Sequence, residues 1–294
     1  MQHYNITFWI WRLMLFFVIN CLSVSGHAKS DDKPLLVTSI KPLAIIAKSA
    51  LQDRARVEYV MPAGLSPHDV VLKLSDMRKL ADADLVFWIG PEFEIRAAKQ
   101  FAAIPQKKLV SAMKLIYPDY EESVNNSDAR HDDEHAHDID PHIWLSPKIA
   151  NQMAEILLNR LDLPVLEIFT EQAKIKTNAL LAPVKDGNYM VHHQGIGYFV
   201  EEFKLQPGLS IRDMLGKQKG TKTQFKMRSE AKNLAVSCVF IEPQHGHKDA
   251  MVVAKDLSVP TTPIDILAVA SGDKLPNYES YIYGLAAQFS ACFN

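Results

Sequence analysis

Short apolar segments that alternate with helical patterns limit what the first half of this chain can fold into. Four apolar runs of strand length stand at residues 35–40, 57–61, 84–90 and 108–112, and helical patterns at 41–51, 75–83 and 94–103 separate them. Strands that are joined through helices in this way form parallel sheets. We therefore expect residues 29–145 to form one β/α lobe with a mostly parallel, four-stranded sheet.

The same alternation returns after residue 187. Strand patterns occupy residues 189–194, 236–242 and 260–265, helical patterns occupy 195–204, 225–233, 248–257 and 277–293, and residues 206–222 show no clear periodicity. Between the halves, residues 146–186 contain two helical stretches, 147–161 and 165–181, which we interpret as a spacer. The predicted fold class is α/β, with a second β/α lobe at 187–294.

The composition is that of an ordinary globular protein. The chain has 294 residues, of which 48% are hydrophobic and 22% charged, and its net charge is −2. There is enough chain for two cores. The charge gives no excess of basic residues of the kind that nucleic-acid binding requires, so no nucleic-acid partner is expected.

Residues 1–28 have the pattern of a signal peptide. Arg12 precedes an apolar run at 13–19, and small residues surround Ala28, near which we expect cleavage. The run is shorter than the roughly 20 residues that a membrane-spanning helix needs. We therefore expect a protein exported to the periplasm, with Cys21 removed together with the leader.

Two cysteines, Cys238 and Cys292, remain after such a cleavage. In an exported protein the simplest interpretation is one disulfide, which would tie the last helix to the strand pattern at 236–242. The alternative is that both sulfurs bind zinc. Neither cysteine lies beside another candidate ligand, so the disulfide has the better support.

Residues 131–147 contain four histidines among acidic residues, a composition typical of a metal-handling segment. His131, His135 and His137 belong to a loop that we place at 128–138. His142 differs, because Pro141 precedes it and an aromatic residue and a Ser-Pro helix start follow it, which should hold its imidazole in one place. The alternative interpretation is a solvated acidic loop whose histidines have no function.

Other candidate ligands lie far away in the sequence. His68 follows a predicted strand, His192 and His193 end another, and Asp265 ends a third. Adjacent strand residues point to opposite faces, so only one of the two neighbouring histidines can face a given site. His245 and His247 lie in a loop and are either surface imidazoles or accessory metal contacts. Such separated groups are typical of a metal site that the fold closes.

Several of these segments together carry a family resemblance. Residues 62–69 with 75–94 resemble the first-lobe signature of the cluster A-I metal-binding proteins of ABC importers, with the zinc-uptake branch as the best fit. Residues 140–147 resemble the second metal-histidine segment of that family, and His193 with residues 197–199 resembles the third. Residues 238–244 with Cys292 resemble its second-lobe strand and terminal disulfide.

The resemblance implies two β/α lobes joined by a long rigid helix, with one metal ion in the cleft between them. The ligands that it implies are His68, His142 and His193, with Asp265 as a less certain fourth. It favours His193 over His192. The implied function is capture of Zn²⁺ in the periplasm and delivery to the membrane permease of an ABC importer, by a monomer. His131, His135 and His137 would be accessory, low-affinity ligands.

Two further functions remain open at this stage. Three neutral imidazoles favour zinc, whereas a manganese- or iron-type binding protein of the same fold would prefer more carboxylate oxygen. A zinc metalloenzyme would also use three histidines and a water. However, the chain has no HExxH pattern, and Glu242, the best candidate for a general base, lies in an apolar strand pattern, so we do not expect an enzyme. A surface adhesin or a metal buffer would use the same fold without a transporter.

Overall fold

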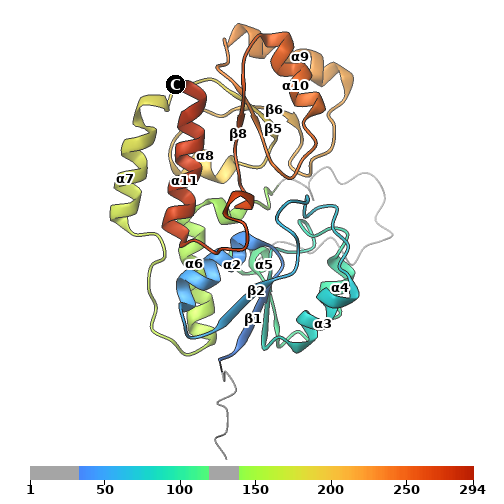
Figure 1. Ribbon diagram of the computed structural model, residues 1–294, viewed down its shortest axis with the longest axis vertical. Helices are drawn as coiled ribbons and strands as arrows, with labels where there is room; N and C mark the ends of the chain where they lie inside the picture. The colour runs from blue at the N-terminus through green and yellow to red at the C-terminus, as the bar shows by residue number, and fades with distance from the viewer. Residues whose placement is uncertain (1–32, 119–138) are drawn as a thin grey trace, which may run out of the picture. The chain divides into compact units, whose positions relative to one another are not determined.

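Two parallel four-stranded sheets form the framework of the protein in its computed structural model (Figure 1). The first sheet has the order β2-β1-β3-β4 and the second the order β6-β5-β7-β8. All strand pairs in both sheets are parallel, which confirms the predicted α/β class. The strands are β1 (Leu35–Thr38), β2 (Arg56–Tyr59), β3 (Leu85–Trp88), β4 (Leu109–Ser111), β5 (Met190–His193), β6 (Leu209–Arg212), β7 (Val239–Ile241) and β8 (Thr261–Pro263).

The structure describes residues 33–118 and 139–294. Residues 34–294 make up one compact unit that holds both sheets. The signal peptide predicted at 1–28 and the histidine-rich loop predicted at 128–138 lie outside the described residues. Within the described part, none of the helices combines the length and the apolar character that crossing a membrane requires.

Helices cover and connect the two sheets. Around the first sheet lie α2 (Lys41–Leu51), α3 (Leu74–Asp82), α4 (Ala98–Ala102) and α5 (Ala112–Ile116). The connecting segment contains η2 (Ile143–Leu145), α6 (Pro147–Arg160), α7 (Glu171–Leu181) and η3 (Ala182–Val184). The second half contains α8 (Gly197–Glu202), α9 (Thr221–Asn233), α10 (Lys248–Leu257), η4 (Val269–Ser271), α11 (Tyr278–Ser290) and η5 (Ala291–Phe293).

The most apolar strand of the chain lies inside the first sheet. All four residues of β3 are buried, and Val86 pairs with Val37 of β1 in the parallel register. A strand that is buried on both faces needs such a continuous apolar run, because helices cover both sides of a parallel sheet. α2 contributes a second apolar layer and packs on α6.

The segment between the lobes is not the single long helix that the family resemblance implied, but it does contain two helices, as the patterns at 147–161 and 165–181 predicted. It forms two helices, α6 and α7, separated by residues 161–170. Pro164 lies in this break, and proline disfavours a helix both at its own position and at the residue before it. The Thr170 side chain then accepts a hydrogen bond from the Ala173 N–H at 3.2 Å, so α7 begins at residue 171 rather than at 165.

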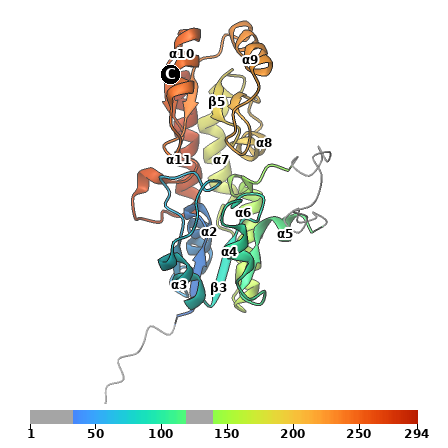
Figure 2. The ribbon, with the colours of Figure 1, turned by 90° about the vertical axis from the view of Figure 1, so that its right-hand side faces the viewer.

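The last helix, like the connecting segment, is attached to both lobes. At its start, the Tyr278 N–H donates to Ser49 Oγ of α2 at 2.9 Å. Near its end, the Phe289 ring lies 4.9 Å from the ring of Tyr189 and 5.3 Å from that of Phe240, both in the second lobe. α7 packs along α11, and the two helices run side by side in both views (Figures 1 and 2).

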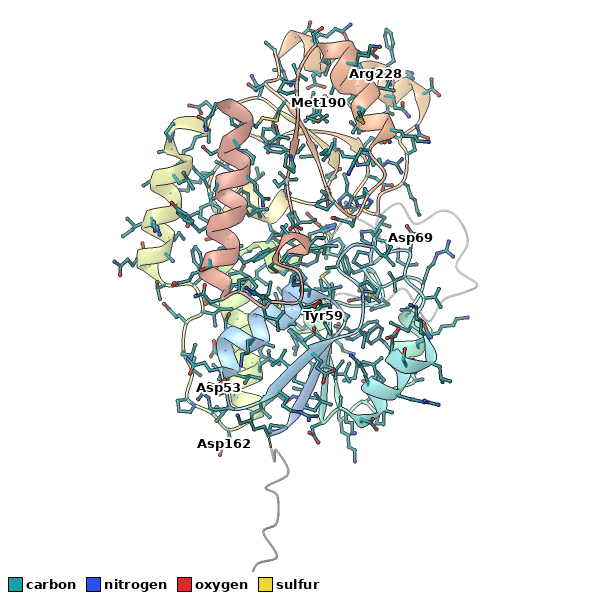
Figure 3. All side chains as sticks on the ribbon, in the orientation of Figure 1. Asp53, Tyr59, Asp69, Asp162, Met190 and Arg228 are labelled. Atoms are coloured by element: carbon teal, nitrogen blue, oxygen red, sulfur yellow. A yellow bond between two sulfur atoms is a disulfide. The ribbon has the colours of Figure 1, made fainter. Side chains whose placement is uncertain are left out.

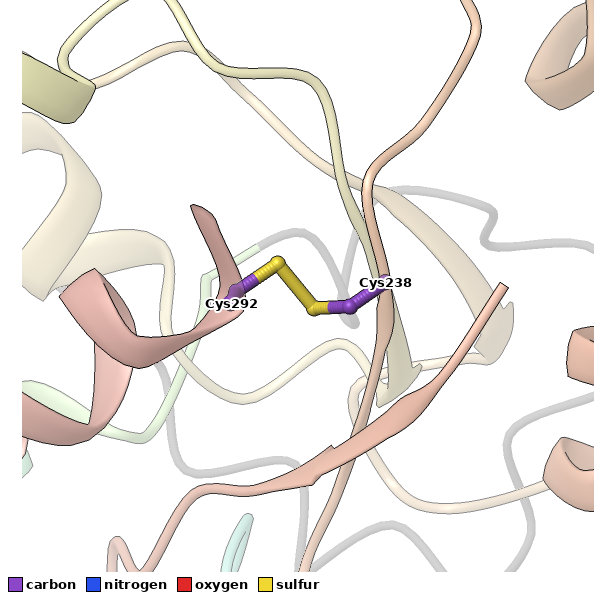
Figure 4. The surroundings of a disulfide bond; sticks show 2 residues. All are labelled: Cys238 and Cys292. Atoms are coloured by element: carbon purple, nitrogen blue, oxygen red, sulfur yellow. A yellow bond between two sulfur atoms is a disulfide. The ribbon is translucent and has the colours of Figure 1, made fainter. Parts of the chain in front are cut away.

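A disulfide between Cys238 and Cys292 fixes the end of the chain to the residue before β7 (Figure 4). The two Cα atoms lie 5.7 Å apart, and 54 positions separate the cysteines in the sequence. The predicted pairing is confirmed, and the alternative of two zinc thiolates is wrong.

Two elements depart from the expectations. The segment 206–222, which had no clear periodicity, contains β6 and the start of α9. The helix expected at 94–103 is shortened to α4, because the chain turns back before it. The Glu94 carboxylate accepts hydrogen bonds from the N–H groups of Ile89 and Gly90, at 3.1 and 2.9 Å, and holds this turn.

Candidate metal centre

Three histidines from three distant segments meet at one point. The nitrogens that His68, His142 and His193 offer as ligands all lie within 4.8 Å of one another. Their ring centroids are separated by 4.8 to 5.8 Å. All three residues are at least 95% buried. We call this group the histidine triad.

His68 lies in the loop that follows β2, next to Asp69, which is labelled in Figure 3. Its Nδ1–H donates to the Phe93 carbonyl oxygen at 3.0 Å, and the Phe93 ring packs edge-on against the imidazole. Burial and the two neighbouring imidazoles lower the pKa of His68 to about 3. The residue is therefore neutral, and its Nε2 lone pair is available to a metal ion.

His142 stands directly before η2 and is held by Asp140. Oδ1 of Asp140 accepts from Nδ1–H of His142 at 2.6 Å and from its backbone N–H at 3.0 Å. Burial would raise the pKa of Asp140, but the imidazole and its two hydrogen bonds lower it overall. An ionised carboxylate on Nδ1 fixes the tautomer that leaves Nε2 free for a metal.

Trp144 holds this segment against the second lobe. It is fully buried, and its Nε1–H donates to the Ile266 carbonyl oxygen at 3.1 Å. Its own carbonyl oxygen accepts from the Tyr278 hydroxyl at 2.7 Å. These contacts explain why the aromatic residue two positions after His142 keeps that imidazole in place.

His193 ends β5, and both of its nitrogens face hydrogen-bond acceptors. Nδ1 lies 3.0 Å from Oε1 of Glu242, and Nε2 lies 2.9 Å from the Met214 carbonyl oxygen. Burial would lower the pKa of His193, but the Glu242 carboxylate and both hydrogen bonds raise it overall. The two acceptors favour a proton on each nitrogen of this ring. A metal that binds Nε2 must displace a proton and the contact with Met214.

The glycines after His193 leave room for the site. A Cβ on Gly195 would lie 2.5 Å from Cε1 of His193, and a Cβ on Gly197 would lie 2.8 Å from Oδ2 of Asp140. Real Cβ contacts are essentially never shorter than 3.0 Å. A side chain at either position would therefore displace a ligand ring or the carboxylate that orients one.

His192 does not join the triad. Its Nε2 lies 2.8 Å from Oδ1 of Asp249, on the first turn of α10, and Nε of Arg212 donates to the other carboxylate oxygen at 2.8 Å. Neighbouring residues of β5 thus face different partners, as strand geometry requires.

Asp265 follows β8 but is not one of the ligand side chains grouped in the described part of the chain. Its Oδ1 accepts from the Val269 N–H at 2.9 Å and its Oδ2 from the Ala270 N–H at 2.8 Å. Lys41 binds the same turn through the Ala268 carbonyl oxygen at 2.6 Å. The carboxylate therefore closes a turn of the backbone.

The remaining candidate ligands differ in their position relative to the triad. His245 lies close to the triad: its ring centroid is 5.1 Å from that of His193, and with His193 and Glu242 it forms a second group of ligand atoms within 4.8 Å of one another. His247 lies two residues further along the same loop. The other three candidates lie outside the described residues: His131, His135 and His137.

The sequence did not reveal which acceptors hold the triad. Asp140 stands two residues before His142, a spacing that could have suggested the contact. Glu242 faces His193 only because β7 lies beside β5. The arrangement suits a divalent ion of intermediate softness, since each imidazole has one nitrogen oriented by an acceptor. The second nitrogen of His193 also contacts the Met214 carbonyl oxygen, which an ion would have to replace.

Comparisons with known proteins identify the family of the chain. The family model described as "Zinc-uptake complex component A periplasmic" matches residues 36–162 and 167–292. A protein of Yersinia pestis named "High-affinity zinc uptake system protein ZnuA" is 30% identical over 292 residues, covering 87% of this chain and 90% of that protein.

Solved structures share the fold. "Crystal structure of ZnuA" has a TM-score of 0.71 at 21% identity and covers 88% of this chain and 99% of that one. The "periplasmic zinc binding protein TroA from Treponema pallidum" has a TM-score of 0.71 at 16% identity, with the same coverage. The family match extends over both lobes, so this chain belongs to the periplasmic component A family of zinc-uptake complexes.

Proposed function

We propose that this protein binds Zn²⁺ through His68, His142 and His193 in the periplasm and delivers it to the membrane permease of an ABC-type importer. The observation that carries the proposal is the histidine triad, three buried imidazoles from both halves of the chain whose ligand atoms lie within 4.8 Å of one another. Membership of the zinc-uptake family supports the transport role.

The ligand chemistry favours zinc. Three imidazole nitrogens form the site, and each has an acceptor on its second nitrogen: the Phe93 carbonyl, Asp140 and Glu242. Zinc binds such nitrogen ligands with tetrahedral geometry, whereas manganese prefers more oxygen. Asp265 would have to release two backbone N–H groups to serve as a fourth ligand. We therefore propose three protein ligands and one open position.

The position of the ligands also supports a role in delivery. His68 and His142 belong to the segments around the first lobe, and His193 belongs to the second sheet. Movement of one lobe relative to the other would remove a ligand and lower the affinity. We propose that docking of a monomer on the permease drives such a movement, which needs to displace a ligand by only a small distance.

Metal titration of the mature protein tests the site. Competition with a chromophoric chelator should give much tighter binding of Zn²⁺ than of Mn²⁺. His68→Ala and His142→Ala should each weaken zinc binding by more than about 100-fold, because loss of an outer partner alone costs about 10- to 100-fold. Asp265→Asn should leave the affinity within about tenfold, and a larger loss would make Asp265 a ligand.

Growth under zinc limitation tests the transport role. A strain without this protein should recover growth on expression of the wild type but not of His68→Ala, and only when the permease is present. If the wild type rescues growth without the permease, it acts as a metal buffer rather than as an importer component. Unchanged zinc affinity in both histidine variants would disprove the triad as the binding site.

A further inference from the structure

A second group of imidazoles lies beside the triad. His245 and His247 belong to the loop that leaves β7, and His192 lies next to this loop. The His245 ring centroid is 5.7 Å from that of His192. The His192 and His247 centroids are 6.5 Å apart. The first of these distances falls within the 4.8 to 5.8 Å of the triad, and the second is slightly longer.

The hydrogen bonds of His192 resemble those of a metal-binding histidine. Nε2 lies 2.8 Å from Oδ1 of Asp249, and a contact this short between nitrogen and carboxylate requires a proton on Nε2. Nε of Arg212 lies 3.1 Å from the same Nε2, but its single hydrogen points to the nearer Oδ2 of Asp249 at 2.8 Å. The contact between Nε2 and Oδ1 of Asp249 therefore uses the hydrogen of His192. Nδ1 of His192 is therefore a bare lone pair. It is buried, in a side chain that is 1% exposed, and has no hydrogen-bond partner among the described residues.

Two further polar atoms in this loop are also buried without a hydrogen-bond partner in the described part of the chain. They are Nδ1 of His247 and Oε1 of Gln244. The amide nitrogen of Gln244 donates to Oε2 of Glu242 at 2.6 Å, which fixes Oε1 as the acceptor end. A buried acceptor that lacks a donor is unfavourable by about 1–3 kcal/mol. A cation between such atoms would satisfy them together.

The adjacent carboxylate supplies negative charge. Oε2 of Glu242 lies 4.0 Å from Nε2 of His245, and the two residues share with His193 the second group of ligand atoms that lie within 4.8 Å. Oε1 of the same carboxylate contacts Nδ1 of His193, so Oε2 is the oxygen that faces the loop. Gly246 stands between the two loop histidines, and a Cβ there would meet nothing within 4 Å. The loop has space to bring His247 closer to His192.

We propose that His192, His245 and His247, next to the Glu242 carboxylate, form a second binding position for a divalent transition-metal ion. It differs from the site of the proposed function, because it uses none of the three triad ligands. The ring centroid of His245 nevertheless lies 5.1 Å from that of His193. An ion held here could therefore pass to the triad by exchanging His245 for His193 as a ligand. Since the loop must close around the ion, this position should bind more weakly and exchange faster.

The test counts ions in the mature full-length protein. His131, His135 and His137 are first changed to alanine, so that the histidine-rich segment cannot contribute. Equilibrium dialysis against a series of free Zn²⁺ concentrations, with elemental analysis, should then find two ions per chain with separable affinities. Adding His245→Ala and His247→Ala should remove the weaker ion and leave the tight one. A single ion in the parent, or two in the double variant, would overturn the proposal.

Two further variants keep the test decisive. His68→Ala in the same background should weaken the tight ion and retain the second, so that failure of the triad and failure of this position are told apart. If the double variant does not unfold cooperatively, His247→Gln alone should weaken the second ion by at least about tenfold. An unchanged second affinity in His247→Gln would exclude His247 from the position.

Discussion

Oδ1 of Asp140 accepts two hydrogen bonds from His142, one from the ring Nδ1–H at 2.6 Å and one from the backbone N–H at 3.0 Å. A single oxygen thus fixes both the tautomer of this imidazole and its position. The half-buried carboxylate stays ionised, since the imidazole and its hydrogen bonds lower its pKa.

We predict that Asp140→Asn weakens zinc binding by about 10- to 100-fold, because the amide lacks the charge that orients and polarises the imidazole. Chelator competition measures the effect. The matched control is Asp69→Asn, because Asp69 follows a triad histidine but its side chain is 76% exposed. Equal losses in the two variants would mean that general charge, rather than the contact with His142, matters.

Gly195→Ala should weaken zinc binding without unfolding the protein. The new Cβ would lie 2.5 Å from Cε1 of His193, so the ring must shift, at a cost of about 1–3 kcal/mol for an overpacked site. The control is Gly64→Ala, in the loop that carries His68, where a Cβ meets nothing within 4 Å. Calorimetric zinc titration of both variants should separate them, and identical affinities would contradict the prediction.

Zinc affinity should fall as the pH is lowered, and His193 should dominate the effect. Its pKa is raised above the ordinary value of 6.5, so it carries a proton below that raised value and must lose it to bind the ion. His68, with a pKa of about 3, needs no deprotonation near neutral pH. Below the raised pKa, affinity should drop about tenfold per pH unit, with release of about one proton per ion.

Calorimetry in buffers of different ionisation enthalpy counts the released protons. Chelator competition between about pH 8 and pH 5 gives the slope. An affinity that stays flat from pH 7 to pH 6 would show that His193 is already neutral, in conflict with its two acceptor contacts.

Deletion of residues 128–138 should leave the tight zinc site intact and lower the number of ions bound per chain. The reason is composition, because this segment contributes three histidines and several acidic residues that bind metal weakly on their own. Calorimetric stoichiometry before and after deletion checks this. The same number of ions in both proteins would rule out metal capture by the segment.

Removal of the disulfide should lower stability but not zinc affinity. Changing Cys238 and Cys292 together to serine opens a loop of 54 positions, and this should reduce the free energy of unfolding by about 2–4 kcal/mol. Denaturant unfolding measures the loss. Zinc titration of the folded variant should match the wild type, since neither sulfur belongs to the described ligand groups.

Parts of this fold could be predicted from local patterns and parts could not. The four consecutive apolar residues of β3, with a glycine and a proline following closely, predict a buried strand. β6 gave no such signal, since it includes a buried serine, Ser210, and ends at Arg212, which binds Asp249. Glu94 suits a helix by composition, yet its carboxylate binds two backbone N–H groups and ends the helical pattern early.

The candidate site divides in the same way. Proline-bounded loops and strand ends pointed to His68, His142 and the pair His192 and His193, and the family resemblance favoured His193 within that pair. The contacts of Glu242 with His193 and of Asp265 with η4 depend on which strands and turns become neighbours, and sequence order does not state this. Glu242, suggested as a general base, thus orients an imidazole of the triad, and Asp265, suggested as a ligand, closes a turn.

Because α11 is attached at both ends, its length sets the distance between the two lobes, and the proposed metal binding depends on this distance. Its first residue, Tyr278, is hydrogen-bonded to Ser49 of α2. Just beyond its last turn, Cys292 forms the disulfide with Cys238, the residue before β7. One extra helical turn between these points would push the two sheets apart by about 5 Å. A metal–nitrogen bond is only about 2 Å long, so His193 would then be out of reach of an ion held by His68 and His142. The length of α11, thirteen residues of which none belongs to the triad, is therefore one of the conditions for the proposed site.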